Sequence, residues 1–230
     1  MTIVDARPLT QRCAKIYAAG EHALLGVSAL NGFFSVPNLT GLLGWAVGRF
    51  GRVDVLVPGI ELAGTLVARG YERPRARKKA REEINNTRNR VARALEALGR
   101  PPVGVFSWTD LYGEPAYERA RREIGECYEA DQSFRSRCRQ ALEPILHQGE
   151  QAAEQVAEAL PFLLAELPLV LDSPAVLGVP TSSFCYPRLM PMAEWLFSGS
   201  MGISPSAGQA ILTTRLTPVV AGEDHCRGVG

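Results

Sequence analysis

Short apolar runs alternate with segments of helical periodicity in the first half of this chain. The apolar runs predict buried strands at residues 22–28, 53–57 and 103–108. Apolar residues spaced three and four apart predict helices at residues 39–50 and 60–68, and a long helix that begins at Pro74 and stops before Gly99. This alternation of strands and helices predicts an α/β fold with a parallel sheet.

Helical patterns dominate the second half of the chain. Helices are predicted at residues 115–130, 133–147, 150–167 and 191–198, an extended segment at 184–187 and a last strand at 209–215. Residues 217–230 are polar and contain glycines, which predicts a disordered tail. In a chain of 230 residues without an internal repeat, we expect one domain over residues 1–216, followed by that tail.

The composition is that of an ordinary soluble globular protein. Hydrophobic residues make up 46% and charged residues 21% of the chain, so a full core is expected without disulfides. The five cysteines show no paired spacing, which indicates neither a zinc site nor a disulfide framework. Glu166, Asp172 and several prolines interrupt the apolar stretch at 160–184, so no membrane span is predicted. Because no signal-peptide pattern is present, we expect a cytoplasmic location.

Positive charge is concentrated on the long predicted helix, although the whole chain carries only +1. Residues 72–93 contain nine Lys or Arg and three Glu, an excess of +6, so the remaining chain carries −5. On a helical wheel, five cations share one side, away from the apolar residues: Arg75, Lys78, Lys79, Arg90 and Arg93. Such a ridge suits a phosphate backbone, and the alternative is a merely solvated helix face.

Common catalytic motifs are absent from the sequence. It contains no GxxxxGK[ST] loop, GxSxG elbow or HExxH pair, and no HIGH or KMSKS signature of class I aminoacyl-tRNA synthetases. Ser28 lies at the carboxyl end of the first predicted strand, where α/β sheets place chemistry. His22, six residues earlier, is about 20 Å away along an extended strand, so no serine triad is predicted. Ser28 is therefore either a turn residue or an acceptor of acyl groups from an already activated ester.

Two other residues are candidates because of their surroundings. Glu166 lies in the apolar segment FLLAELPLVL, near the end of a predicted helix, where a carboxylate is either paired or shifted in pKa. A surface carboxylate at a helix end is the alternative. Tyr186 has a restricted backbone because Pro187 follows it, and its alternative is a buried tyrosine that only satisfies its hydroxyl.

Several segments together resemble the cyclodipeptide synthases. They are HALLGVSALNGFFS at 22–35, WAVGRFGRVDVLVPG at 45–59, the basic helix, and DSPAVLGVPTSSFCYP at 172–187. The resemblance implies a single Rossmann-like domain, similar to the catalytic domains of tyrosyl- and tryptophanyl-tRNA synthetases. It also implies that two aminoacyl-tRNAs are condensed to a cyclic dipeptide by a ping-pong reaction, without a cofactor or metal.

The resemblance assigns roles to individual residues. Ser28 matches the nucleophile that receives the first aminoacyl group, and Glu166 matches the glutamate that contacts the amino group of that aminoacyl moiety. Tyr186 matches the tyrosine that holds the intermediate, and the basic helix matches the one that holds the first tRNA. Asn31, Tyr186 and Pro187 fall at the three positions that separate two branches of the family. Asn31 is typical of the other branch, a residue that the proline branch tolerates, and Pro187 favours the branch with proline after the tyrosine.

The chain departs from the family pattern at Phe162, where many members have a tyrosine that also binds the amino group. The resemblance further assigns a set of residues to the pocket for the first side chain: Leu24, Gly26, Leu169 and Phe184. Because Phe184 is large, we expect a small first amino acid, alanine. Arg188 favours an acidic second amino acid, glutamate, if it reaches the second pocket, and an apolar one if it points to solvent.

Two alternative functions remain on the same fold. One is a non-catalytic aminoacyl-tRNA-binding protein, which only Phe162 favours. The other is a hydrolase that deacylates aminoacyl-tRNA. The sequence is compatible with a monomer and with a homodimer.

Overall fold

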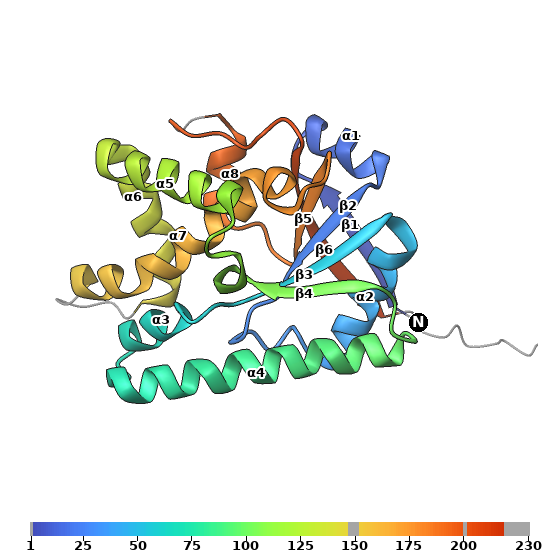
Figure 1. Ribbon diagram of the computed structural model, residues 1–230, viewed down its shortest axis with the longest axis horizontal. Coiled ribbons are helices and arrows are strands. Elements are labelled where there is room, and N and C mark those ends of the chain that lie inside the picture. The colour runs from blue at the N-terminus through green and yellow to red at the C-terminus, as the bar shows by residue number, and fades with distance from the viewer. Residues whose placement is uncertain (1, 147–151, 200–201, 219–230) are drawn as a thin grey trace, which may run out of the picture.

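The computed structural model describes residues 2–146, 152–199 and 202–218. Its centre is a six-stranded sheet in the order β1-β6-β5-β2-β3-β4 (Figure 1). The strands are β1 (Thr2–Pro8), β2 (His22–Gly26), β3 (Arg52–Val57), β4 (Val103–Ser107), β5 (Ser182–Tyr186) and β6 (Gln209–Pro218). All neighbouring strands pair in parallel except β1, which is antiparallel to β6. The predicted α/β class is confirmed.

Helices cover both faces of the sheet. The helices are α1 (Gln11–Ala19), α2 (Val36–Arg49), α3 (Leu62–Ala68), α4 (Arg73–Ala97), α5 (Pro115–Ala130), α6 (Gln132–Leu142), α7 (Ala152–Leu177) and α8 (Pro191–Phe197). One hydrophobic cluster joins α2 and α4 to the sheet, and another joins α5, α6, α7 and α8 to its opposite face. In Figure 1, α4 runs along the lower edge of the molecule, and α5, α6 and α7 gather on its left.

Burial on both faces explains the unbroken apolar runs of the central strands. Within β2, Ala23 and Leu25 pack on the α2 and α4 side, whereas Leu24 packs on the α7 side. All five residues of β2 are buried. Such strands lack the alternating pattern of a half-exposed strand, and their length and flanking turns identified them instead.

The structure corrects the predicted end of the helix that carries Glu166. That helix was expected to end at residue 167, but α7 continues to Leu177, with a kink at Asp172 and with Pro161, Pro168 and Pro174 inside it. Proline removes a backbone donor and normally disrupts a helix. Here Leu169, Val170 and Leu171 are buried in the core, and this packing outweighs the lost hydrogen bonds. Glu166 therefore lies in mid-helix, facing a cavity.

Other boundaries differ less. α6 ends at Leu142 and a short 3-10 turn, Glu143–Ile145, follows it, whereas the helix was expected to reach residue 147, which lies outside the described residues. β1 and α1 were not predicted, because the edge segment of β1 has only short polar and apolar alternation. β6 continues to Pro218, two residues into the predicted tail, and residues 219–230 lie outside the described part of the chain.

One helix segment, Ala153–Leu177, is long and apolar enough to cross a membrane by length and composition alone. It also contacts α3, α5 and α6 and supplies much of one hydrophobic cluster, and core helices pass the same test.

Candidate active site

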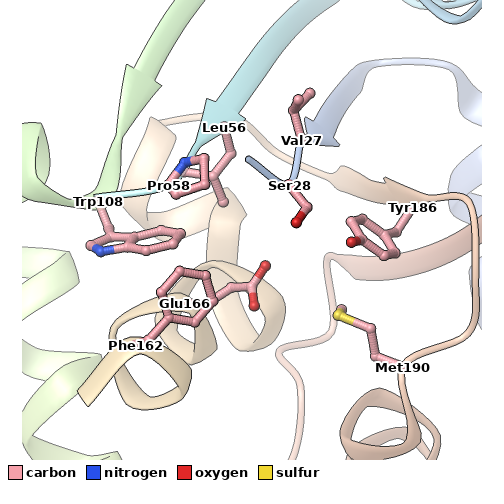
Figure 2. Close-up of a pocket in the computed structure, with 9 residues that line it drawn as sticks. All are labelled: Val27, Ser28, Leu56, Pro58, Trp108, Phe162, Glu166, Tyr186 and Met190. Atoms are coloured by element: carbon pink, nitrogen blue, oxygen red, sulfur yellow. The ribbon is translucent and has the colours of Figure 1, made fainter. Parts of the chain in front are cut away.

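A small cavity opens at the carboxyl ends of β2, β3 and β5, with a volume of about 60 Å³. Parallel α/β sheets characteristically bind ligands at this edge. Nine residues line the cavity: Val27, Ser28, Leu56, Pro58, Trp108, Phe162, Glu166, Tyr186 and Met190 (Figure 2). The three predicted catalytic residues, Ser28, Glu166 and Tyr186, thus meet in one place although they are far apart in sequence.

Ser28 lies two residues past β2, in a loop that leads to α2. The backbone N–H of Val27 donates to the Leu56 carbonyl at 2.9 Å, which extends the β2–β3 pairing to the residue before the nucleophile candidate. Figure 2 shows the Ser28 hydroxyl directed toward Glu166 and Tyr186. His22 is buried at the opposite end of β2 and hydrogen-bonds Ser182 and Asp54, so it does not reach Ser28.

Glu166 is the acidic group of the cavity. Burial raises the pKa of its carboxyl from 4.5 to about 7. None of the ion pairs among the described residues involves this carboxylate. Near neutral pH, the group is therefore present in both its protonated and its charged form, as a proton-transfer residue requires.

Tyr186 ends β5 and faces Ser28 from the other side of the cavity (Figure 2). Burial, followed by the charge of Glu166, raises the pKa of the phenol, while hydrogen bonds with the side chains of Asn31 and Ser28 act in the opposite direction. Asn31 itself accepts a hydrogen bond from the Phe33 backbone N–H at 3.0 Å through Oδ1. This contact orients the amide of Asn31 so that its nitrogen can donate a hydrogen bond to the Tyr186 hydroxyl oxygen.

The remaining wall of the cavity is aromatic. Phe162 and Trp108 meet edge to face, with ring centroids 5.0 Å apart. The Trp108 indole N–H points away from the cavity (Figure 2) and donates to Glu61, which also accepts from the Tyr112 hydroxyl. A Cβ at Gly59 would lie 2.3 Å from Trp108 Nε1, so only glycine permits this close approach. These contacts fix the indole as one wall of the cavity.

Our sequence reasoning missed most of this wall. Trp108 is the last residue of one predicted strand, in the segment FSW, and Pro58 directly follows another, in VLVPG; that position was the available signal. Glu61 and Met190 carried no such signal.

The residues assigned to the first side-chain pocket are deeply buried. Leu24, Leu169 and Phe184 have no exposed surface and belong to the hydrophobic cluster that contains Leu56 and Trp108. Phe184 lies over Gly26, where a Cβ would be 3.0 Å from its ring. These residues support the cavity from the core, and none of them is among its lining residues.

Arg188 is exposed and does not line the catalytic cavity. It lies in a separate cleft of about 260 Å³ that also contains Asn31 and Pro187.

The five cations of the predicted ridge do not share one surface. Arg75, Lys78 and Arg93 are exposed, whereas Lys79 is partly buried, with its ammonium 3.3 Å from Glu83. The prediction is wrong for the direction of Arg90. Its guanidinium turns inward and donates to the Ala29 carbonyl at 3.4 Å and to Thr87 Oγ1 at 3.0 Å. The wheel placed Arg90 on the outer side because it ignores a neighbouring loop that a long side chain can reach.

Within the described residues, no group of three or more His, Cys, Asp or Glu side chains is arranged to hold a metal ion.

Comparisons with known proteins agree with this geometry. A family model described as cyclodipeptide synthase matches residues 4–215. The cyclo(L-leucyl-L-phenylalanyl) synthase of Streptomyces noursei is 32% identical over 90% of both chains. The cyclo(L-tyrosyl-L-tyrosyl) synthase of Mycobacterium tuberculosis is 31% identical over 92% of this chain and 76% of that protein.

Solved structures give the same relationship. A cyclodipeptide synthase from Bacillus thermoamylovorans superimposes with a TM-score of 0.86 at 26% identity, over 94% of this chain and 97% of the other. A tyrosyl-tRNA synthetase from Archaeoglobus fulgidus shares the fold alone, with a TM-score of 0.55 at 12% identity over 90% of this chain and 59% of that one. The chain therefore belongs to the cyclodipeptide synthase family and is an aminoacyltransferase.

Proposed function

We propose that this enzyme takes two aminoacyl groups from aminoacyl-tRNAs and joins them by a ping-pong reaction through acyl intermediates on Ser28. One observation carries the proposal: Ser28, Glu166 and Tyr186 converge on one small cavity, and no histidine is among its described lining residues. A serine without an imidazole base suits an ester that is already activated, as in aminoacyl-tRNA, better than an amide.

In the first step, Ser28 Oγ attacks the ester carbonyl of the first aminoacyl-tRNA. The new Ser28 ester forms as the bond to the terminal ribose oxygen breaks, and the serine proton passes to that departing oxygen. Tyr186 hydrogen-bonds Ser28, so it is placed to relay this proton. The raised pKa of the tyrosine keeps the phenol protonated, as a relay requires.

In the second step, the amino group of the Ser28-bound residue attacks the ester carbonyl of the second aminoacyl-tRNA. The peptide bond forms as the bond to the terminal ribose oxygen breaks, and a proton from the attacking amine passes to that departing oxygen, which leaves a dipeptidyl group on Ser28. An ammonium group must lose its proton first. α-Amino groups have pKa values of about 7.7–8.0, and the pKa of Glu166 is raised to about 7. The two values are close, so proton transfer from the amine to Glu166 costs little. The free amine of the dipeptidyl group then attacks the Ser28 ester, which closes the ring and releases the serine.

Phe162 makes Glu166 the main polar anchor of that amine. Phe162 packs on Trp108 and presents only ring carbons to the cavity, where the family pattern has a hydroxyl. A lost hydrogen bond to a charged group is worth about 1.5–3 kcal/mol. The proposal therefore assigns ammonium binding chiefly to the carboxylate.

For the first tRNA, we propose the outer surface of α4. Arg75, Lys78 and Arg93 are exposed there, and Lys79 is half-exposed. Arg90 belongs to a different part of the site, beside the backbone of the Ser28 loop. Phosphate contacts of this kind position a nucleic acid without reading its bases.

A small first side chain, alanine, fits the cavity best. One water needs about 10–15 Å³ of such space, so the cavity of about 60 Å³ holds only a few atoms beside the wall formed by Trp108 and Phe162. The second amino acid stays a prediction: glutamate if Arg188 reaches the second pocket, and an apolar residue if Arg188 points to solvent. A cytoplasmic location, the proline branch and the choice between monomer and homodimer stay predictions.

Mass spectrometry of medium from a bacterium that overproduces the protein tests the proposed function. A diketopiperazine is expected, and incubation of the pure protein with aminoacyl-tRNA should add one aminoacyl mass to a peptide that contains Ser28. tRNA binding without adduct or product would favour the non-catalytic alternative, which Phe162 supports. Release of free amino acid alone would favour the hydrolase.

A further inference from the structure

A second cleft lies beside the catalytic cavity, at the same edge of the sheet. Seven residues line its volume of about 260 Å³: Asn31, Phe33, Pro187, Arg188, Thr214, Arg215 and Leu216. Tyr186 and Thr213 are register partners on the parallel strands β5 and β6. Arg188 and Arg215 each follow two residues later, just past the last register pair of these strands, and both line the cleft.

These two cations lack anionic partners among the described residues. Both side chains are exposed, and neither takes part in an ion pair between described residues. Asp5 faces Arg215 across the β1–β6 pair, but its carboxylate binds Arg7 at 2.7 Å. Among these described residues, three arginines thus stand against one carboxylate. Adjacent like charges repel each other, and a bound anion relieves that repulsion.

The cleft and the catalytic cavity share a wall. Asn31 lines the cleft, and its side chain hydrogen-bonds the Tyr186 hydroxyl inside the cavity. Pro187, which directly follows Tyr186, lines the cleft as well. An anion held by Arg188 is therefore next to the reacting groups, at the mouth of the site.

The cleft also lies on the opposite side of Ser28 from the basic helix. α4 packs against β3, on one side of β2, whereas Arg188 and Arg215 extend from β5 and β6, on the other side. The acceptor in the second step is attacked by the amine held at Glu166 and not by Ser28 Oγ. The ester of the second aminoacyl-tRNA must therefore lie a few bond lengths away from the position of the first ester. A separate phosphate contact would hold the second tRNA in that displaced position.

We propose that Arg188 and Arg215 form an anion site for the 3′-terminal phosphodiester of the second aminoacyl-tRNA. This site rests on the proposed tRNA-dependent function and adds where the second substrate is held. Guanidinium groups bind phosphate oxygens in bidentate fashion, and the half-buried Phe33 ring in the same cleft offers a surface for base stacking. A side-chain carboxylate of the second amino acid is the other anion with this chemistry. Exposure of both arginines at the rim favours the phosphodiester.

The test is the double variant Arg188→Gln/Arg215→Gln, examined by single-turnover kinetics. Loading of Ser28 from the first aminoacyl-tRNA should be unchanged. Transfer to the second aminoacyl-tRNA should slow by about tenfold or more, because two charge-assisted contacts are lost. The slope of log rate against log salt for this step should flatten by about 0.7, the contribution of one phosphate contact on a single strand. The matched control is Arg12→Gln/Lys15→Gln, which removes two exposed cations from α1 and should leave both steps unchanged.

A second acceptor distinguishes the two anions. With an activated aminoacyl ester that has no phosphate, the double variant and the unchanged enzyme should transfer at the same rate. A loss that persists with this ester and follows acidic amino acids would assign the arginines to a side-chain carboxylate and overturn the phosphodiester site. Unchanged transfer from aminoacyl-tRNA would overturn the anion site altogether. If the unchanged enzyme never forms an acyl group on Ser28, the tRNA-dependent function fails instead, and the site fails with it.

Discussion

Each end of the parallel sheet holds a serine and an acidic side chain, but the two sets differ in burial and in hydrogen bonding. At the amino end, His22 contacts Ser182 Oγ at 2.7 Å and Asp54 Oδ2 at 3.2 Å, the contacts of a serine–histidine–aspartate set. At the carboxyl end, Ser28, Glu166 and Tyr186 share a cavity that no histidine of the described residues lines. A search for catalytic geometry alone would choose the wrong end.

The two ends differ in solvent access and in how many of their polar groups already have hydrogen-bond partners. His22, Asp54 and Ser182 are at most 4% exposed, and none of them lines a cavity described above. Ser182 is further bonded to Ser173, which also bonds Gln209, and Arg52 closes the network on Asp54 at 2.7 Å. A Cβ at Gly104 would lie 2.1 Å from Asp54 Oδ1, so even the neighbouring strand is adapted to this carboxylate. Fully bonded buried groups stabilise a fold and have no capacity left for a substrate.

Polar groups at the carboxyl end of the sheet remain able to bind a substrate, and this reduces the stability of the fold. Glu166 is desolvated and forms no ion pair with another residue that the structure describes, and its pKa is raised to about 7, whereas Asp54 has a lowered pKa. For Asp54, desolvation acts to raise the pKa, but the hydrogen bond with His22 and the charge of Arg52 outweigh it. One acid is therefore held in a reactive state, and the other is held in a stabilising one.

Among the substitutions that test this difference between the two ends, Ser28→Ala should have the largest effect on activity. Product formation should fall by at least about 10³-fold, because the acyl acceptor is lost while the cavity is otherwise kept. The measurement is diketopiperazine yield together with the acyl adduct by mass spectrometry. The matched amino-end variant, Ser182→Ala, should reduce stability and leave the rate per folded molecule unchanged. An active Ser28→Ala enzyme would refute the acyl-serine mechanism.

Glu166→Gln should reduce activity and increase stability at the same time. The rate should fall by about 10²-fold or more, as for loss of a proton-transfer group. The folded-state pKa is above the unfolded value, so the charged carboxylate costs stability as pH rises through about 4.5 to 7. At pH 8, the free energy of unfolding should rise by up to about 3 kcal/mol, and near pH 4 it should not change. Urea unfolding at both pH values measures this, and equal stability at pH 8 would contradict a desolvated Glu166.

Asp54→Asn is the same acid-to-amide change at the other end, and its sign should be opposite. The lowered folded pKa means that charged Asp54 contributes stability above its unfolded pKa, near 3.8. At pH 7, the variant should lose about 1–3 kcal/mol, the value of hydrogen bonds to a buried charge. The difference should vanish as pH falls through the folded pKa of Asp54. A loss that is independent of pH would show that shape, and not charge, matters at this position.

The sequence predicted the two ends unequally. Ser28 was identifiable because an apolar strand ends just before it, and the position of Glu166 in an apolar segment indicated a shifted pKa. Both conclusions depend only on the residues adjacent in sequence, and folding keeps those residues buried around Ser28 and Glu166. Tyr186 was a candidate because Pro187 restricts its backbone, and the segment resemblance supplied its role. Trp108, Glu61 and Met190 come from three separate elements, and only the packing of those elements brings them to the cavity or to its wall.

Local pattern also failed where side chains respond to distant partners. The extension of α7 past Pro168 depends on core contacts of Leu169 and Leu171, and a helix-breaking residue gives no hint of them. Arg90 turns toward Ala29 because the Ser28 loop lies beside α4, a contact between residues 61 positions apart. His22 was correctly excluded as a partner of Ser28. Its hydrogen-bond network with Ser182 and Gln209 joins three strands that are distant in sequence, so the sequence alone did not predict it.

Phe162→Tyr should have the smallest effect, and it tests how nearly alone Glu166 binds the amine. The added hydroxyl enters a cavity wall beside Glu166, where it can accept a hydrogen bond from the substrate ammonium. We expect KM for the first aminoacyl-tRNA to fall by about threefold to tenfold, with kcat nearly unchanged, as a hydrogen bond of about 0.5–1.5 kcal/mol implies. Phe162→Leu is the control, because it removes the ring contact with Trp108 without adding a donor or acceptor. The decisive comparison is the same substitution in the Glu166→Gln background. If the hydroxyl and the carboxylate share one ammonium, Phe162→Tyr should rescue part of the activity lost there, and an absent rescue would mean that the phenylalanine only shapes the cavity.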